Sequence, residues 1–216
     1  MDQENIYKFL QGKLEQTDLY HKDEQKQFQE YRKTDKMIAL FLVVIYFKLT
    51  FNSTLQNQGS QLDELISVKV VSVSNTPFQK TIRALQDFSF QKLITPDIEE
   101  WVIIDRNVNY EIHHCKTKSK TDMIFGEIKQ VGQNIAYFVS ASIDNPSVVV
   151  EKERALTKYF LNSTVVEKMN ENQSKITFIL CQNISRFDLQ TNNKILLESV
   201  PPYLEQLSKA FEQYPY

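Results

Sequence analysis

Short stretches of alternating β-branched and aromatic residues, separated by polar turns, fill most of the sequence between residues 65 and 182. Short strands at regular spacing are typical of an antiparallel sheet. A Val131-Gly132 turn and a polar segment at 169–173 suit hairpin connections. The pattern predicts strands over residues 65–74, 101–104, 110–115, 122–128, 134–142, 153–161 and 175–182.

Apolar residues at helical spacing predict three helices around these strands. The first covers residues 5–36, the second begins at Pro77 and ends before Pro96, and the third covers residues 192–211, where Pro201-Pro202 should kink it. The order of helix, strand, helix, strands and helix predicts an α+β fold. We divide the chain into an N-terminal helical segment, residues 1–36, and one domain, residues 37–216.

The unbroken apolar run from residue 37 to residue 47 allows three interpretations. Its β-branched and aromatic residues favour a buried strand, although a buried helix fits the pattern as well. The run is shorter than the roughly 18 residues of a membrane span, but a membrane anchor stays as the third alternative.

Several function classes are excluded by what the sequence lacks. A formal net charge of −2 gives no sign of a nucleic-acid partner. The four glycines form no phosphate-binding loop. Cys115 and Cys181 lie far apart, which excludes a zinc ribbon or a redox motif and fits reduced thiols. The acidic, polar N-terminus is unlike a signal peptide, so we expect a cytoplasmic protein.

The sequence offers no metal or cofactor motif. His113 and His114 are adjacent, so on a strand they point to opposite faces and cannot bind one ion together. We therefore expect no metal, no cofactor and no catalytic residues.

Four motifs, in order, resemble the START (StAR-related lipid-transfer) family. Residues 144–156 contain an Asp-x-Pro turn followed by Arg154-Ala-Leu, and residues 119–125 keep the aspartate and apolar residues of a second family motif. Residues 174–179 resemble a family strand, and residues 202–210 resemble its closing helix. The resemblance covers roughly residues 65 to 213.

This resemblance implies the helix-grip fold, a curved antiparallel sheet wrapped around a long C-terminal helix with a tunnel between them. It implies that the tunnel holds a lipid or sterol for transfer or sensing, without covalent chemistry. Transient membrane contact, and a protein partner bound through the N-terminal segment, follow as expected interactions. The resemblance also suggests a buried polar pair, Asp122 with Arg154; Glu127 is the other candidate partner of the arginine. We expect the cavity to be lined by Phe125, Phe138, Arg154, Leu156, Phe178, Leu180, Leu204 and Leu207.

Two other functions fit the same fold. A START-like scaffold with a filled tunnel would act as an interaction subunit of a larger assembly. A helix-grip cyclase or hydrolase would need an acid–base group inside the cavity. The sequence does not name the lipid or the oligomeric state.

Overall fold

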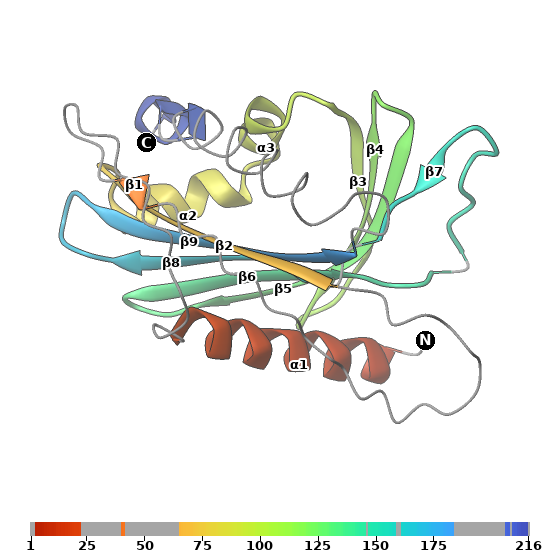
Figure 1. The fold of residues 1–216 in the computed structure, drawn as a ribbon, viewed down its shortest axis with the longest axis horizontal. Coiled ribbons are helices and arrows are strands. Elements are labelled where there is room, and N and C mark those ends of the chain that lie inside the picture. Colours follow the sequence, from red (N-terminus) through yellow and green to blue (C-terminus); the bar gives the residue numbers. More distant parts are fainter. Residues whose placement is uncertain are drawn as a thin grey trace.

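One curved antiparallel sheet with helices on both faces makes up the protein (Figure 1). The computed structural model describes residues 3–22, 40–41, 65–145, 147–158, 161–183, 206–207 and 209–215. Among these residues, eight strands follow the order β1-β2-β9-β8-β6-β5-β4-β3, and a ninth, β7, pairs with β5. The bounds are β1 Leu40–Phe41, β2 Leu65–Ser74, β3 Ile98–Arg106, β4 Glu111–Thr117, β5 Thr121–Val131, β6 Ile135–Ser142, β7 Ala155–Leu156, β8 Leu161–Lys168 and β9 Ser174–Asn183.

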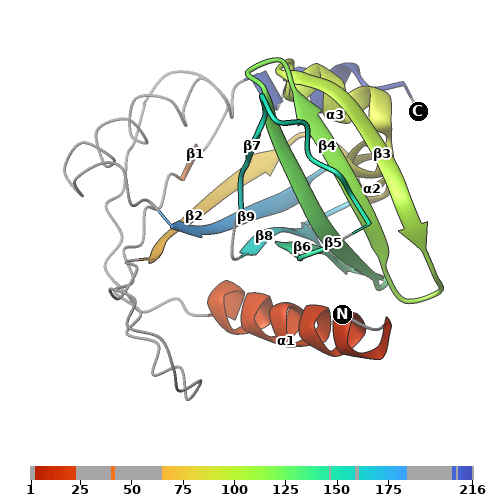
Figure 2. The same ribbon diagram turned by 90° about the vertical axis from the view of Figure 1, so that its right-hand side faces the viewer.

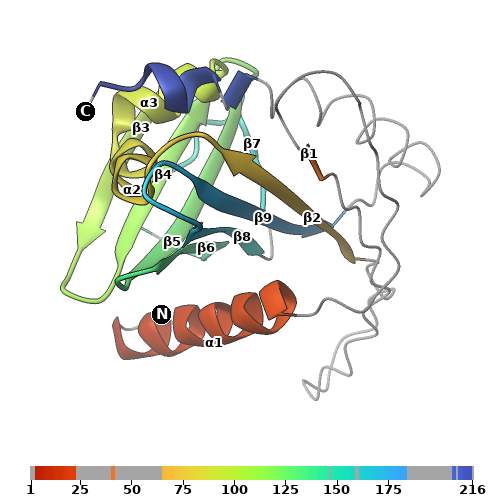
Figure 3. The same ribbon diagram turned by 90° about the vertical axis from the view of Figure 1, so that its left-hand side faces the viewer.

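Helix α1 (Gln3–Lys22) lies along one face of the sheet, and the other described helices lie on the opposite face (Figures 2 and 3). Its Ile6 and Leu10 are buried in one cluster with Ile124, Val139 and Ile179, which come from three strands of the sheet. Burial of such side chains is the dominant favourable term in folding, so this cluster holds α1 on the sheet.

Charged contacts fix the C-terminal end of α1. The ammonium group of Lys69 donates hydrogen bonds to the carbonyl oxygens of Tyr20 and His21, at 3.0 and 2.9 Å. A cation at this end of a helix interacts favourably with its unpaired carbonyls. His21 Nε2 lies 3.3 Å from a carboxylate oxygen of Glu167 on β8, and Lys175 Nζ lies 2.8 Å from the same oxygen.

Helices α2 (Phe78–Gln86) and α3 (Phe88–Ile94) cover the other face together with helical residues 206–207 and 209–213. The ring of Phe90 packs against Phe211, with ring centroids 4.8 Å apart, and Leu207 is buried in the same cluster. The predicted closing helix is therefore present at its C-terminal end, while residues 192–205 lie outside the described residues.

The helix predicted between Pro77 and Pro96 is two helices. Asp87 has an extended backbone, ends α2 and caps α3, where its carboxylate accepts a hydrogen bond from the backbone N–H of Ser89 at 2.7 Å. Aspartate is among the best residues for this capping position, which explains the break.

The strand predicted over residues 153–161 is wrong. Of the described residues 153–158, Ala155–Leu156 form a short strand, which pairs parallel to the start of β5, and both residues are exposed. The full strand is Leu161–Lys168, the antiparallel partner of β6 and β9. Its consecutive Asn162, Ser163 and Thr164 gave it the character of a polar turn in the sequence.

The apolar run at 37–47 lies mostly outside the described residues. Leu40–Phe41 form a short strand that pairs with β2, as the strand interpretation expects. No helix in the described part of the chain is long and apolar enough to cross a bilayer.

Replacing Gly126 with Ala should loosen the packing of α1. A Cβ at this β5 position would lie 2.9 Å from Leu10 Cδ1, and Leu10 is fully buried. Overpacking of this kind costs about 1 kcal/mol or more of the free energy of unfolding. Gly12→Ala is the matched control, because a Cβ there meets open space and alanine favours the helix by about 1 kcal/mol. Chemical denaturation measures both, and an unchanged stability for Gly126→Ala would contradict this packing.

Replacing Glu167 with Gln should weaken the attachment of α1 in a pH-dependent way. Its contact with His21 lowers the pKa of Glu167, burial opposes this, and Lys175 lowers the pKa further, from 4.5 to about 2. Because the folded pKa is depressed, the stabilisation is complete above pH 4.5 and is lost as the pH falls towards 2.

Denaturation curves measured across that pH range test this dependence. The wild type should exceed Glu167→Gln by about 1 kcal/mol at neutral pH, and the two should converge in acid. Glu171→Gln is the control on the same hairpin, because its ion pair with Lys168 is exposed. A difference in stability between wild type and Glu167→Gln that stays constant across this pH range would refute the pH dependence assigned to Glu167.

Candidate functional site

A cavity of about 230 Å³ lies between α2 and α3 on one side and the sheet on the other. Three phenylalanines form the apolar part of its wall: Phe125 on β5, Phe138 on β6 and Phe178 on β9. The described residues that line it are Leu85, Gln91, Ile94, Thr95, Ile98, Trp101, Cys115, Met123, Phe125, Glu127, Phe138, Ser140, Asn162, Thr164 and Phe178.

The alternation of the strands decides which side chains reach the cavity. On β5, Met123, Phe125 and Glu127 line it, whereas Ile124 and Ile128 belong to the cluster under α1. Successive side chains of a strand point to opposite faces, so the two sets separate by parity.

Three of the expected lining residues line the cavity, and two others pack elsewhere. Phe125, Phe138 and Phe178 line the cavity. Leu156 does not, because it is 44% exposed on the short strand β7, and Leu207 packs in the cluster around Phe211.

Leu180 and Leu204 are the remaining expected leucines. Leu180 is half-buried on β9 and is not among the described lining residues. Leu204 lies outside the described residues.

Asp122 and Arg154 form the expected ion pair, but on the opposite side of the sheet from the cavity. Asp122 is fully buried, and its second carboxylate oxygen lies 2.9 Å from His114 Nε2. Arg154 also donates to the carbonyl oxygen of Thr117 at 2.7 Å. Burial works against the charged carboxylate, but the hydrogen bonds from Arg154 and His114 outweigh it and hold the pKa of Asp122 below its usual value. The pair therefore ties the loop before β8 to β5 and is not a polar group of the cavity.

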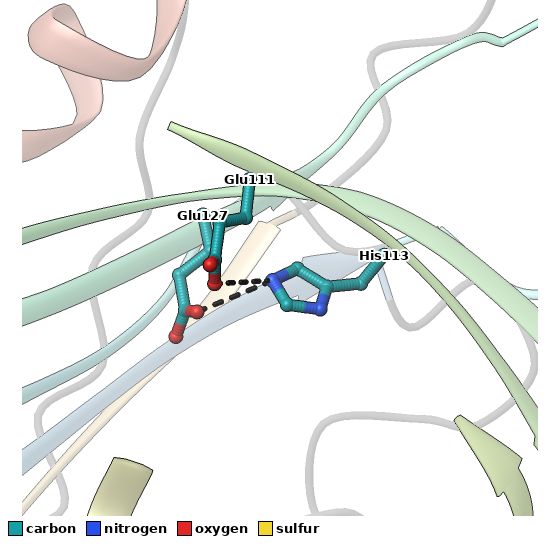
Figure 4. Close-up of side chains that lie close together, drawn as sticks. All are labelled: Glu111, His113 and Glu127. Atoms are coloured by element: carbon teal, nitrogen blue, oxygen red, sulfur yellow. Dashed lines mark ion pairs between the residues drawn. The ribbon is translucent and has the colours of Figure 1, made fainter. Parts of the chain in front are cut away.

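The polar end of the cavity is formed around Glu127, which sequence reasoning considered only as a partner of Arg154. Its carboxylate lies 2.9 Å from Lys129 Nζ. It also lies 3.3 Å from His113 Nε2 (Figure 4). Glu111 lies 2.7 Å from the same lysine and 3.5 Å from the same imidazole nitrogen.

Trp101 orients the imidazole of His113. The indole Nε1–H of Trp101 donates to His113 Nδ1 at 3.0 Å, and the imidazole stacks on Phe125 with ring centroids 5.0 Å apart. An indole only donates, so Nδ1 carries the lone pair and the proton of the neutral ring sits on Nε2. His113 Nε2 is buried without a hydrogen-bond partner among the described residues.

This tautomer does not suit a metal ion, although Glu111, His113 and Glu127 lie close enough together to hold one. A metal-bound imidazole normally donates its other N–H to an acceptor. Here Nδ1 accepts a hydrogen bond from Trp101 instead, and Lys129 already pairs with both carboxylates. We interpret the three residues as part of a charge network around Lys129.

His113 and His114 point to opposite faces, as the sequence predicts. His113 contacts Trp101 and Phe125 on the cavity side, and His114 contacts Asp122 on the other. Cys115 and Cys181 are buried and not joined in a disulfide. Burial, and then the nearby Asp122, raise the pKa of Cys115 to about 11, so this cavity thiol is a poor nucleophile.

The sequence could have revealed part of this site. Once Phe125 is taken as inward, Met123 and Glu127 follow from the period of a strand. Trp101 and His113 could not be placed, because their contact depends on the β3–β4 register, which is shifted at two irregularities.

In the helix-grip class of α+β proteins, a curved antiparallel sheet packs around helices on one face, with a cavity between the sheet and the helices. Comparison with solved structures places the chain more narrowly. Human StAR-related lipid transfer protein 5 superposes with a TM-score of 0.73 and 8% identity over 99% of both chains. Human STARD10 superposes with a TM-score of 0.71 and 12% identity over 100% of this chain and 81% of the other. The chain has the START-type helix-grip fold, and the fold prediction is confirmed.

A bacterial structure shows the same fold. The STAR-related lipid transfer protein of Xanthomonas axonopodis superposes with a TM-score of 0.55 and 10% identity over 84% of this chain and 97% of that one. No protein-family model matches the sequence, and no curated protein matches it. The likeness therefore lies in the fold.

Replacing Arg154 with Met should destabilise the protein strongly. The change leaves the buried carboxylate of Asp122 with His114 as its remaining side-chain partner, and removing one partner of an ion pair destabilises strongly when the other charge stays buried. Lys158→Met is the control, because its pair with Asp144 is exposed at both ends. Denaturant midpoints measure both, and equal effects of the two changes would show that the Asp122–Arg154 pair is energetically unimportant.

Proposed function

We propose that this chain binds one lipid in the cavity and does no covalent chemistry on it. The observation that carries the proposal is the apolar wall of Phe125, Phe138 and Phe178 between the sheet and the α2–α3 pair. Apolar walls with a few placed polar groups are typical of small-molecule sites. The START-type fold supports the same function.

The driving force is the removal of apolar ligand surface from water, roughly 25 cal/mol per Å². Phe125, Phe138 and Phe178 are the proposed contacts with the ligand's hydrocarbon part. The volume of about 230 Å³ lies below the roughly 300–1,000 Å³ of ordinary ligand sites, so the proposed ligand is small or has a single chain.

Exchange with membranes extends this proposal. A lipid that leaves a bilayer for an equally apolar cavity loses little free energy, so transfer or sensing needs only transient membrane contact. We place this activity in the cytoplasm.

A ligand-free scaffold is the second candidate. The small volume favours it, because a tunnel filled by its own side chains would leave no room for a lipid. The described surface of α1 that meets the sheet is already occupied, so a partner would bind its exposed face.

We do not propose an enzyme. Among the described lining residues, Glu127 and Cys115 are the candidates for acid–base or nucleophilic chemistry. Glu127 is paired with Lys129, and the pKa of Cys115 is raised to about 11. Neither group is poised for acid–base or nucleophilic work.

Filling the cavity should abolish lipid binding without unfolding the protein. Thr164 lines the cavity from β8, so the ring of a Thr164→Phe variant would occupy its space. Native mass spectrometry after incubation with mixed liposomes should find one lipid per wild-type chain and none on Thr164→Phe, and circular dichroism checks that the variant folds.

Leu156→Asp is the matched control. Leu156 is exposed and lies outside the cavity, so this variant should keep its lipid. A wild-type protein that stays empty would contradict the carrier and favour the scaffold. Equal loss of lipid from both variants would place the binding site elsewhere.

A further inference from the structure

The polar end of the cavity holds an acceptor, Glu127, which lines it, and next to that acceptor a donor, His113, which is not itself among the described lining residues. The carboxylate of Glu127 lines the cavity and can only accept hydrogen bonds when ionised. The Nε2–H of His113, 3.3 Å from that carboxylate, can only donate, because Trp101 occupies Nδ1. The two atoms are close enough for one oxygen atom to lie within hydrogen-bonding range of both.

The donor lacks a partner among the described residues. His113 Nε2 is buried, and its distances to Glu127 and Glu111, 3.3 and 3.5 Å, do not give it a hydrogen bond. A buried polar group without a partner costs free energy that a ligand can recover by supplying the missing acceptor.

The surrounding charges are already balanced. Arg106 Nε lies 2.6 Å from Glu111, and Lys129 bridges Glu111 and Glu127 at 2.7 and 2.9 Å. Burial acts against the charge of Glu111, but Lys129 and Arg106 outweigh it and lower the pKa of that carboxyl. Two carboxylates thus meet two cations, and the neutral imidazole adds no charge. A charged group on the ligand would find no counterion here, and its removal from water would cost free energy.

We propose that the cavity selects an uncharged lipid that ends in a hydroxyl group, with that hydroxyl bound between Glu127 and His113. This inference rests on the proposed lipid binding and narrows it. A hydroxyl both donates and accepts, so it can donate to the carboxylate and accept from the imidazole. An ether cannot donate, and a fatty-acid carboxylate cannot donate and meets Glu127 with a like charge.

Three probes with the same alkyl chain separate these cases: decanol, its methyl ether and decanoate. Titrations at about pH 8, where decanoate is ionised, should rank decanol about tenfold or more above each of the others, because a hydrogen bond to a charged group is worth that factor. Decanoate binding equal to or tighter than decanol would overturn the inference while leaving lipid binding intact. If none of the three binds, the proposed function itself fails, and the inference fails with it.

The Glu127→Gln variant tests the proposed contact between the carboxylate of Glu127 and the ligand. Removing the charge should raise the affinity for decanoate relative to decanol by about tenfold, because the like-charge repulsion disappears. Glu111→Gln is the matched control, since Glu111 contacts the same lysine and imidazole but is not among the described lining residues. A Glu127→Gln variant that keeps the wild-type ranking would refute the role of this carboxylate, and so would a Glu111→Gln variant that changes the ranking as much.

Discussion

The whole structure depends on the strict alternation of side chains across the central strands. On β5, Ile124 and Ile128 enter the core beneath α1, while Phe125 and Glu127 face the cavity. A shift of one residue in register would exchange these faces and place Glu127 in the apolar core. Fold and site are therefore set by the same pairing of β5 with β4 and β6.

The two faces of the sheet are packed differently. The face under α1 is tightly filled, and a Cβ at Gly126 would lie 2.9 Å from Leu10 Cδ1. The other face carries α2, α3 and the C-terminal helical residues at one end, and it keeps a cavity between them and the strands. The buried Asp122–Arg154 pair lies on the filled face, where it fixes a loop.

Much of this architecture could be predicted from the sequence. The alternation in 65–74 and 134–142 predicted strands that the structure contains, and the ordered motifs indicated the START-type fold that solved structures share. The prediction failed where the polar or apolar pattern of a segment does not match its position in the folded protein. In β8, the polar residues Asn162 and Thr164 line the cavity, and their polarity hid a full strand in the sequence.

The site was only partly predictable for a related reason. Aromatic residues on inward faces could be guessed from composition and spacing, and Phe125, Phe138 and Phe178 do line the cavity. The position of a proton on His113 depends on Trp101, which is twelve residues away in sequence and on the neighbouring strand. Such a contact requires the register, which no single sequence supplies.

The central claim is that an apolar ligand lies inside this cavity. Intermolecular nuclear Overhauser effects between the methylene protons of bound decanol and the protein's aromatic and methyl protons test it most directly. The account predicts contacts to the rings of Phe138 and Phe178 and none to Ile124 or Val139 on the α1 face. Contacts confined to the α1 face or to exposed side chains would contradict it.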